Sequence, residues 1–353
     1  MWHGILGHDD VAEHFRATLR RGRLASTYLF VGPSGIGKRR FATALAKALL
    51  CQKVDEAAPE PYDLEPCSRC ESCRLFAAGS HPDLDVVRLP KDKSTLPLEL
   101  FIGDKEHRNQ DGLCHRIALR PFLGGRKVAI IDDADRFSQE SANCLLKTLE
   151  EPPPRSLVIL IGTSPSRQLP TIRSRSQIVR FQPLAPEFVA QILIDSGAVT
   201  DREQAARLAV YSEGSVERAI AIADPALWQF RAQLLHDLAS ADLDPVRLAK
   251  SIQAFVDDAG KEAAERRDRL RTLVSFAEEF YRGLMRSGLS SNAGGDELLK
   301  ASVAKAASRF TTDRTIDALE SCLSVLEQVD RNANLGLVIQ RWSENLSGCS
   351  VLS

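Results

Sequence analysis

Three short apolar runs in the first half of the chain alternate with segments in which apolar residues recur every three or four positions. The runs at residues 27–31, 127–131 and 157–161 are typical of strands buried on both faces of a parallel sheet. Between the first two runs, positions such as Phe41 and Leu45 follow helical spacing. Strands that alternate with helices predict an α/β fold.

The second half of the chain has a different pattern. From about residue 183 the strand signals fade, and apolar residues such as Leu208 recur at helical spacing. Asp224 and Pro225 mark a joint, after which the sequence predicts only helices, at residues 245–256, 261–286 and 315–329. This last part shows no cluster of reactive groups, so its apolar helical stripes predict a surface for assembly within or between chains.

Length and composition limit the class of protein. A chain of 353 residues exceeds what one hydrophobic core usually organises, so two or three domains are expected. With 44% apolar and 26% charged residues the composition is globular, and the net charge of −1 provides no general basic field for nucleic acid. No apolar run approaches the roughly 20 residues of a membrane-spanning helix, and residues 1–10 lack the features of a secretory signal. A cytoplasmic chain without a membrane contact is expected.

The run at residues 27–31 leads into a glycine-rich segment and then a predicted helix. In a phosphate-binding loop, glycines let backbone N–H groups turn toward phosphate oxygens, and a lysine reaches the β- and γ-phosphates. Gly32, Gly37 and Lys38 stand at the required positions. The alternative is a turn that matches by coincidence. The predicted nucleotide-binding residues of this loop are Gly32, Pro33, Ser34, Gly35, Ile36, Gly37, Lys38 and Arg39.

Two positions depart from an active magnesium site. Arg39 stands where an active loop has Ser or Thr to give a hydroxyl to Mg²⁺. Asp132, after the second apolar run, is the candidate carboxylate on the magnesium side, and Asp133 stands where a Glu would polarise the attacking water. The alternative is a strand followed by an acidic turn. ATP or ADP can still bind, whereas magnesium-dependent hydrolysis by this site is not expected.

Three more places in the sequence supply candidates near a nucleotide. Thr163, after the third apolar run, can place a hydroxyl near the phosphates or simply end a strand. Arg173-Ser-Arg175 lies in a polar stretch, and an exposed arginine there can reach the γ-phosphate of a neighbouring subunit as an arginine finger. Arg218 can turn toward a nucleotide from a helix that begins near Ser215. For all of these arginines the alternative is a solvated surface charge.

Four cysteines lie between residues 51 and 73. Cys51, Cys67, Cys70 and Cys73 can converge as thiolates on one tetrahedral ion, for which zinc is the first choice and a structural role is expected. An iron–sulfur cluster is the main alternative, and a helix face lined by thiols is another. His81 is a further candidate ligand, although a turn explains it better.

Several segments of the chain match sequence motifs of one known protein family. The most specific of them is Leu145-Leu-Lys-Thr-Leu-Glu-Glu-Pro-Pro153. The others are residues 4–8, residues 32–38, the four cysteines, Ser80-His-Pro-Asp83, Arg173-Ser-Arg175 and, more weakly, residues 332–335. Together they resemble the delta-prime family of subunits of the bacterial DNA polymerase III clamp loader, within the AAA+ superfamily. Ser176 stands where that family often has Cys, and the spacer between Cys51 and Cys67 is longer than usual.

The resemblance implies three domains: an AAA+ P-loop domain with a zinc module at about residues 51–73, a small helical lid, and an all-helical collar. Their expected bounds are residues 1–183, 184–224 and 225–353. It implies a stationary subunit with a degraded ATPase site, whose Arg175 enters the ATP site of an adjacent motor subunit.

The implied partners are gamma/tau motor subunits and a delta subunit in a hetero-pentameric ring, the sliding clamp, and primer–template DNA through the complex. The implied task is to help load that clamp. The alternative is an active gamma/tau-like motor, which would need Ser or Thr at position 39 in place of Arg39.

Overall fold

A computed structural model describes residues 2–53, 64–90, 93–123, 125–289 and 296–350. The chain divides into two compact units, Met1–Ala221 and Ile222–Ser353, which we call the sheet unit and the helical unit. The expected division into three domains stays a prediction. Among the described residues, no helix has the length and apolar character needed to cross a membrane.

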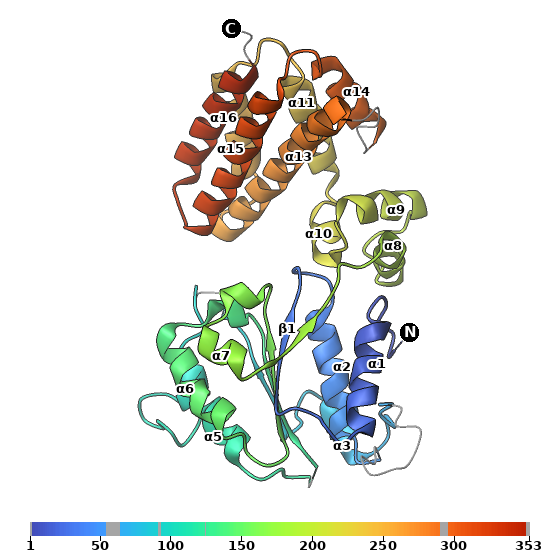
Figure 1. Ribbon diagram of the computed structural model, residues 1–353, viewed down its shortest axis with the longest axis vertical. Helices are drawn as coiled ribbons and strands as arrows, with labels where there is room; N and C mark the ends of the chain where they lie inside the picture. Colours follow the sequence, from blue (N-terminus) through green and yellow to red (C-terminus); the bar gives the residue numbers. More distant parts are fainter. Residues whose placement is uncertain (1, 54–63, 91–92, 124, 290–295, 351–353) are drawn as a thin grey trace. The chain divides into compact units, whose positions relative to one another are not determined.

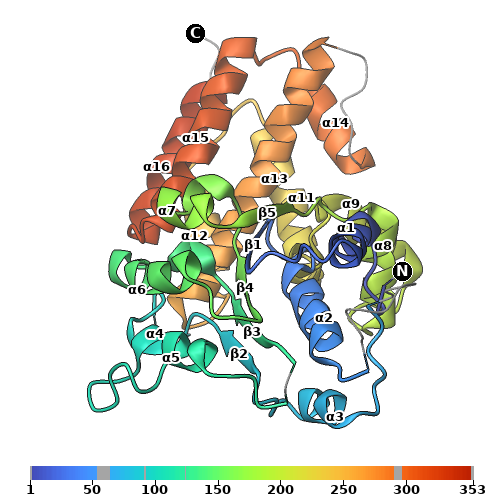
Figure 2. The same ribbon diagram turned by 60° about the horizontal axis from the view of Figure 1, so that its bottom comes forward.

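The sheet unit contains one five-stranded sheet in which all paired strands are parallel (Figures 1 and 2). The strand order is β2-β3-β4-β1-β5, so β1 lies between β4 and β5. The strands are β1 (Thr27–Val31), β2 (Leu84–Val87), β3 (Lys127–Ile131), β4 (Ser156–Ile161) and β5 (Gln177–Arg180). The predicted α/β fold with a parallel sheet is confirmed, and the three apolar runs form its central strands.

Helices cover both faces of this sheet (Figure 2). Because side chains alternate along a strand, Tyr28 and Phe30 pack with α1 and α2, whereas Leu29 and Val31 face the layer of α5, α6 and α7. The helices of this unit are α1 (Asp9–Arg20), α2 (Lys38–Leu50), α3 (Glu71–Ala77), α4 (Glu99–Ile102), α5 (Leu113–Ala118), α6 (Gln139–Glu150), α7 (Pro170–Ser174), α8 (Pro186–Asp195), α9 (Arg202–Tyr211) and α10 (Val216–Ala221), with 3-10 turns at Ala134–Arg136 and Pro165–Arg167.

Local chemistry fixes the ends of α6, the helix that follows β3. Ser138 caps α6, since its hydroxyl accepts the Ser141 N–H at 3.1 Å, and the Ser141 hydroxyl lies 3.0 Å from the Ser138 N–H. The helix ends at Glu150, two residues before Pro152, because proline cannot continue the hydrogen-bond ladder. A serine cap and a proline therefore set the two ends of this helix.

The helical unit contains α11 (Pro225–Leu238), α12 (Pro245–Asp257), α13 (Ala263–Leu289), α14 (Glu297–Ala306), α15 (Thr312–Asp330) and α16 (Leu335–Ser350). The α13 helix packs against α15, and α16 packs against both α12 and α15. A single apolar core, which includes Phe280 and Trp342, fills the space between them. Helices predicted at residues 245–256, 261–286 and 315–329 correspond to α12, α13 and α15.

Candidate functional site

The carboxyl ends of three neighbouring strands meet at one edge of the sheet. The glycine-rich loop follows β1, the acidic residues follow β3, and Thr163 follows β4. Parallel α/β sheets bind ligands at such an edge because the connecting loops diverge there. A cavity of about 1040 Å³ opens at this position in the sheet unit. Of the predicted nucleotide-binding residues, its lining includes Ser34, Gly35, Gly37, Lys38, Arg39, Asp132, Asp133 and Thr163.

The loop after β1 has the backbone conformation that its glycines allow. Gly32, Gly35 and Gly37 have φ angles of +149°, +72° and +98°, which side chains disfavour. A Cβ atom at Gly32 would lie 2.4 Å from the carbonyl oxygen of Phe181. The loop therefore lies close against Phe181, which follows β5, and leads into α2 at Lys38.

Lys38 lies under this loop with 7% of its surface exposed. Its Nζ donates to the carbonyl oxygens of Gly32 at 2.6 Å and Pro33 at 2.5 Å. Burial lowers the pKa of Lys38, and the charges of Asp135 and Asp132 oppose that shift. A phosphate group in the cavity would offer this ammonium a stronger acceptor than a carbonyl.

Arg39 and Asp132, 93 positions apart in the sequence, form an ion pair. The Arg39 Nη1 lies 3.3 Å from the Asp132 Oδ2. Asp133 has a left-handed backbone, with φ of +55°, and both its burial and the charge of Asp132 raise its pKa. Arg39 and Asp133, the two residues that depart from an active magnesium site, thus lie at the same edge of the sheet.

Asp135, which the sequence analysis did not select, organises the end of β4. Its Oδ2 accepts from the N–H and the hydroxyl of Thr163 at 2.7 Å and 2.5 Å, and its Oδ1 accepts from the Gln168 Nε2 at 2.7 Å. The Thr163 hydroxyl therefore already has an acceptor within the protein. A Cβ atom at Gly162 would lie 2.6 Å from the Asp135 Oδ1, so this position needs glycine.

His8 contacts the glycine-rich loop and stabilises its conformation. Its Nε2 lies 2.7 Å from the Ile36 carbonyl oxygen, and its ring meets the Phe181 ring edge to face at 4.9 Å. Burial lowers the pKa of His8, so the neutral ring donates this hydrogen bond through Nε2. The signal in the sequence was the segment 4–8, whose role only the fold explains.

The two candidate arginines lie outside the lining of the cavity. Arg218 pairs with Glu213 at 2.8 Å, while its neighbour Glu217 lines the cavity. Arg175 follows α7, and its Nη2 lies 2.6 Å from the Glu150 Oε1 at the end of α6. The exposed fractions of these two side chains are 34% and 48%, so the pair is open to solvent.

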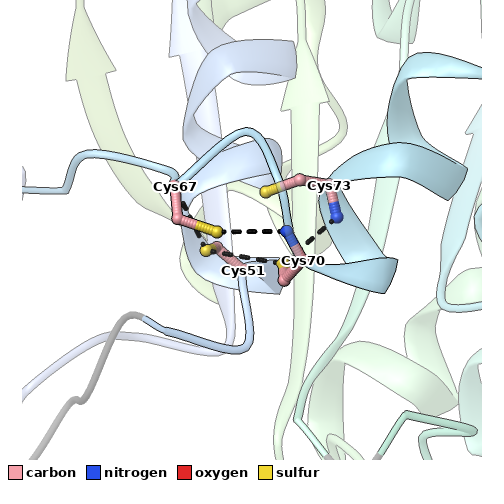
Figure 3. A group of neighbouring side chains, drawn as sticks. All are labelled: Cys51, Cys67, Cys70 and Cys73. Carbon is pink, nitrogen blue, oxygen red and sulfur yellow. Dashed lines mark hydrogen bonds between the residues drawn. The ribbon is translucent and has the colours of Figure 1, made fainter.

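The four cysteines converge at the end of α2 and the beginning of α3 (Figure 3). Their sulfur atoms lie within 4.8 Å of one another, and the Cys51 and Cys70 Sγ atoms are 3.9 Å apart. Four thiolates at about 2.3 Å from one tetrahedral ion would be about 3.8 Å apart. Cys51, the fourth ligand candidate, closes the group although residues 54–63 of its spacer lie outside the described residues. These four residues could hold a metal ion.

The surroundings shift the pKa values of two of these thiols in opposite directions. The N–H of Arg69, and next to it that of Cys70, lowers the pKa of Cys67 to about 6. Burial raises the pKa of Cys73 to about 12. A bound cation would favour the thiolate at both positions, since metal ligation deprotonates a coordinating thiol.

A chain of buried hydrogen bonds joins the module formed by these four cysteines to the rest of the sheet unit. The Asp83 N–H donates to His81 Nδ1 at 3.1 Å, so a neutral ring donates through Nε2 to the Ser72 hydroxyl at 2.8 Å. That hydroxyl donates to the Leu50 carbonyl oxygen at 2.5 Å, directly before Cys51. His81 is thus a support of the module, and the metal-ligand group found among the described residues contains only the four cysteines.

A family model and two relatives indicate the same family. A family model described as DNA polymerase III, delta subunit, matches residues 7–185. The DNA polymerase III subunit delta' of Pseudomonas aeruginosa is 39% identical over 155 residues, which are 44% of this chain and 42% of that protein. The subunit of the same name from Escherichia coli is 32% identical over 228 residues, 64% of this chain and 63% of that protein.

A second kind of relative is also similar. The DNA polymerase III subunit gamma/tau of Mycobacterium bovis is 32% identical over 201 residues, 56% of this chain and 32% of that protein. The chain therefore spans less than two thirds of the length of each of these relatives.

Proposed function

Because the chain belongs to the DNA polymerase III delta-subunit family, we propose that it is a delta-prime-like subunit of a clamp loader with an AAA+ fold. In this role it helps load a sliding clamp onto primer–template DNA, in a ring with gamma/tau and delta subunits. Its own contribution is structural, and the ATP is hydrolysed by its neighbours. The helical unit exposes several large apolar side chains, among them Val246, Leu323 and Leu337, which suits an assembly surface in such a ring.

The observation that carries this proposal is the ion pair of Arg39 with Asp132. An active P-loop ATPase holds Mg²⁺ through a hydroxyl at the position of Arg39 and a carboxylate at the position of Asp132. Here the hydroxyl is absent and the carboxylate is engaged, which disfavours the alternative of a gamma/tau-like motor. The isolated protein should therefore show negligible magnesium-dependent ATP turnover, and steady turnover would favour the motor.

Arg175 is the residue through which the subunit would act on a neighbour. It follows the short α7 helix, and its guanidinium is partly exposed beside Glu150. The proposal is that this guanidinium reaches the γ-phosphate in the adjacent motor subunit, where an arginine finger is worth about 10³-fold or more in rate.

A reconstituted complex tests this role of Arg175. With Arg175→Ala, the ATP site next to this subunit should lose nearly all of its turnover in single-turnover hydrolysis. Arg173→Ala is the matched control because Arg173 is exposed on the same segment, and it should leave the rate unchanged. The Arg175–Glu150 pair is solvent-exposed and contributes at most about 1 kcal/mol to folding, so the variant should assemble normally. An equal rate for both variants would remove the finger role.

The four-cysteine group is proposed to hold one structural Zn²⁺. The short distances between the sulfurs suit a single tetrahedral ion and leave little space for several iron atoms. With all four positions filled by thiolates, no open position remains for catalysis. Elemental analysis of the purified protein should find one zinc per chain. Iron, or no metal at all, would contradict this proposal.

A further inference from the structure

The nucleotide cavity lacks the ligands that magnesium requires. Mg²⁺ takes oxygen ligands in a nearly octahedral arrangement, and P-loop sites supply a hydroxyl after the lysine together with a carboxylate. Arg39 provides no oxygen, and its guanidinium lies against Asp132 at 3.3 Å. The Asp132 side chain is 15% exposed, so a second cation would have to approach it beside the guanidinium. The residues present do not fit this metal.

The same cavity retains the groups that bind phosphate. Lys38 is more than nine-tenths buried, and its ammonium now contacts two loop carbonyls that a phosphate oxygen could replace. The α2 helix begins there without a side-chain cap, so its first N–H groups remain available to an anion. Glycine at position 37, with φ of +98°, lets the loop and the helix meet at this point.

The charge around the cavity is positive even without a metal. Among the described residues, six cationic side chains line it: Lys38, Arg39, Arg40, Lys47, Arg136 and Arg167. Four acidic side chains from the same part of the chain oppose them: Asp132, Asp133, Asp135 and Glu217. An anion is therefore favoured over a complex in which magnesium has already neutralised much of the phosphate charge.

We propose that this cavity binds a nucleoside di- or triphosphate without a divalent cation, and that the Arg39 guanidinium bridges Asp132 and the phosphates where magnesium would otherwise lie. A guanidinium has five N–H donors in a planar fork, so it can donate to a carboxylate and a phosphate at once. The inference rests on the phosphate-loop part of the proposed function and adds the form of the ligand. Bound nucleotide would thus support the fold of the loop without being hydrolysed.

The test measures ADP binding by calorimetry to the full chain, in EDTA and in saturating Mg²⁺. The wild-type protein should bind ADP at least as tightly in EDTA as in magnesium. Arg39→Thr restores the hydroxyl and frees Asp132, so ADP affinity in EDTA should fall about tenfold or more, as expected for the loss of a charge-assisted contact. Added magnesium should restore the affinity of this variant.

Arg40→Thr is the matched control, because it removes the same charge one position further along α2 without touching the Asp132 pair. Its affinity should change by the same factor in both buffers. Wild-type binding that needs magnesium, an Arg39→Thr variant that behaves like Arg40→Thr, or absence of ADP binding in both buffers would each overturn the inference. None of these results would affect the role of Arg175 in the ring, which the Arg175→Ala experiment tests separately.

Discussion

Replacement of Ser72 by Ala should weaken the attachment of the four-cysteine module to the rest of the sheet unit. Ser72 is 1% exposed, and its hydroxyl is the middle member of the hydrogen-bond chain from His81 to the Leu50 carbonyl. The variant leaves both of these buried partners unsatisfied. Each loss costs about 1–3 kcal/mol, so the free energy of unfolding should fall by about 2–6 kcal/mol.

The same change should reduce metal affinity. Ser72 lies next to Cys73, and the Leu50 carbonyl that it holds lies next to Cys51. Residues that hydrogen-bond to the metal ligands and orient them typically contribute 10- to 100-fold to metal affinity. In competition with a chelator, the zinc affinity of Ser72→Ala should therefore be lower by about 10-fold or more.

Urea denaturation of the zinc-loaded protein measures the stability effect. Trp2 belongs to the core of the sheet unit, whereas Trp228 and Trp342 lie in the helical unit, so a background with both latter residues replaced by Phe reports on the sheet unit alone. Ser68→Ala is the matched control, because Ser68 is exposed in the same module. It should change the stability by less than about 0.5 kcal/mol. If the two serine variants unfold at the same urea concentration, the buried chain does not stabilise the module as argued.

Two further perturbations address other parts of the sheet unit. Burial lowers the pKa of His8 and of His81 below 6.5, so below that pH the unfolded chain binds more protons than the folded one. The free energy of unfolding should therefore fall as the pH drops below about 6.5, by up to about 1.4 kcal/mol per pH unit for each histidine, and His8→Gln should flatten this dependence in urea titrations. A stability that rises on acidification would refute the assignment. Gly162→Ala places a methyl group 2.6 Å from the Asp135 Oδ1 and should cost about 1–3 kcal/mol in thermal unfolding, whereas Gly125→Ala meets open space and should be neutral.

Local patterns in the sequence were sufficient for much of the fold. The apolar runs form β1, β3 and β4, because continuous apolar segments of that length are stable only between two helical layers. The glycine positions of the phosphate loop were also readable, since a left-handed backbone is a local property of each residue. The close cysteine spacing from 67 to 73 predicted a common site in the same way.

Contacts between distant segments were decided by the tertiary structure. Arg39 meets Asp132 across 93 positions because the strand order places the ends of β1 and β3 at one edge of the sheet. That order also brings Asp135 to Thr163 and uses the threonine hydroxyl inside the protein. Arg218, a candidate from the sequence, pairs with Glu213 and lies outside the cavity lining.

The sequence by itself determined that β1, β3, β4, α12, α13 and α15 form, and it selected the residues expected to carry phosphate and metal chemistry. It left open the partner of each charged group, because residue spacing reports only on neighbours within one helix, strand or turn. The tertiary structure decided that Arg39 is paired with the carboxylate expected to hold magnesium, that Cys51 closes the thiol group and that His81 supports it. The physical reason is that these contacts depend on strand order and helix packing. The hydrophobic spacing within any one segment does not fix either of them.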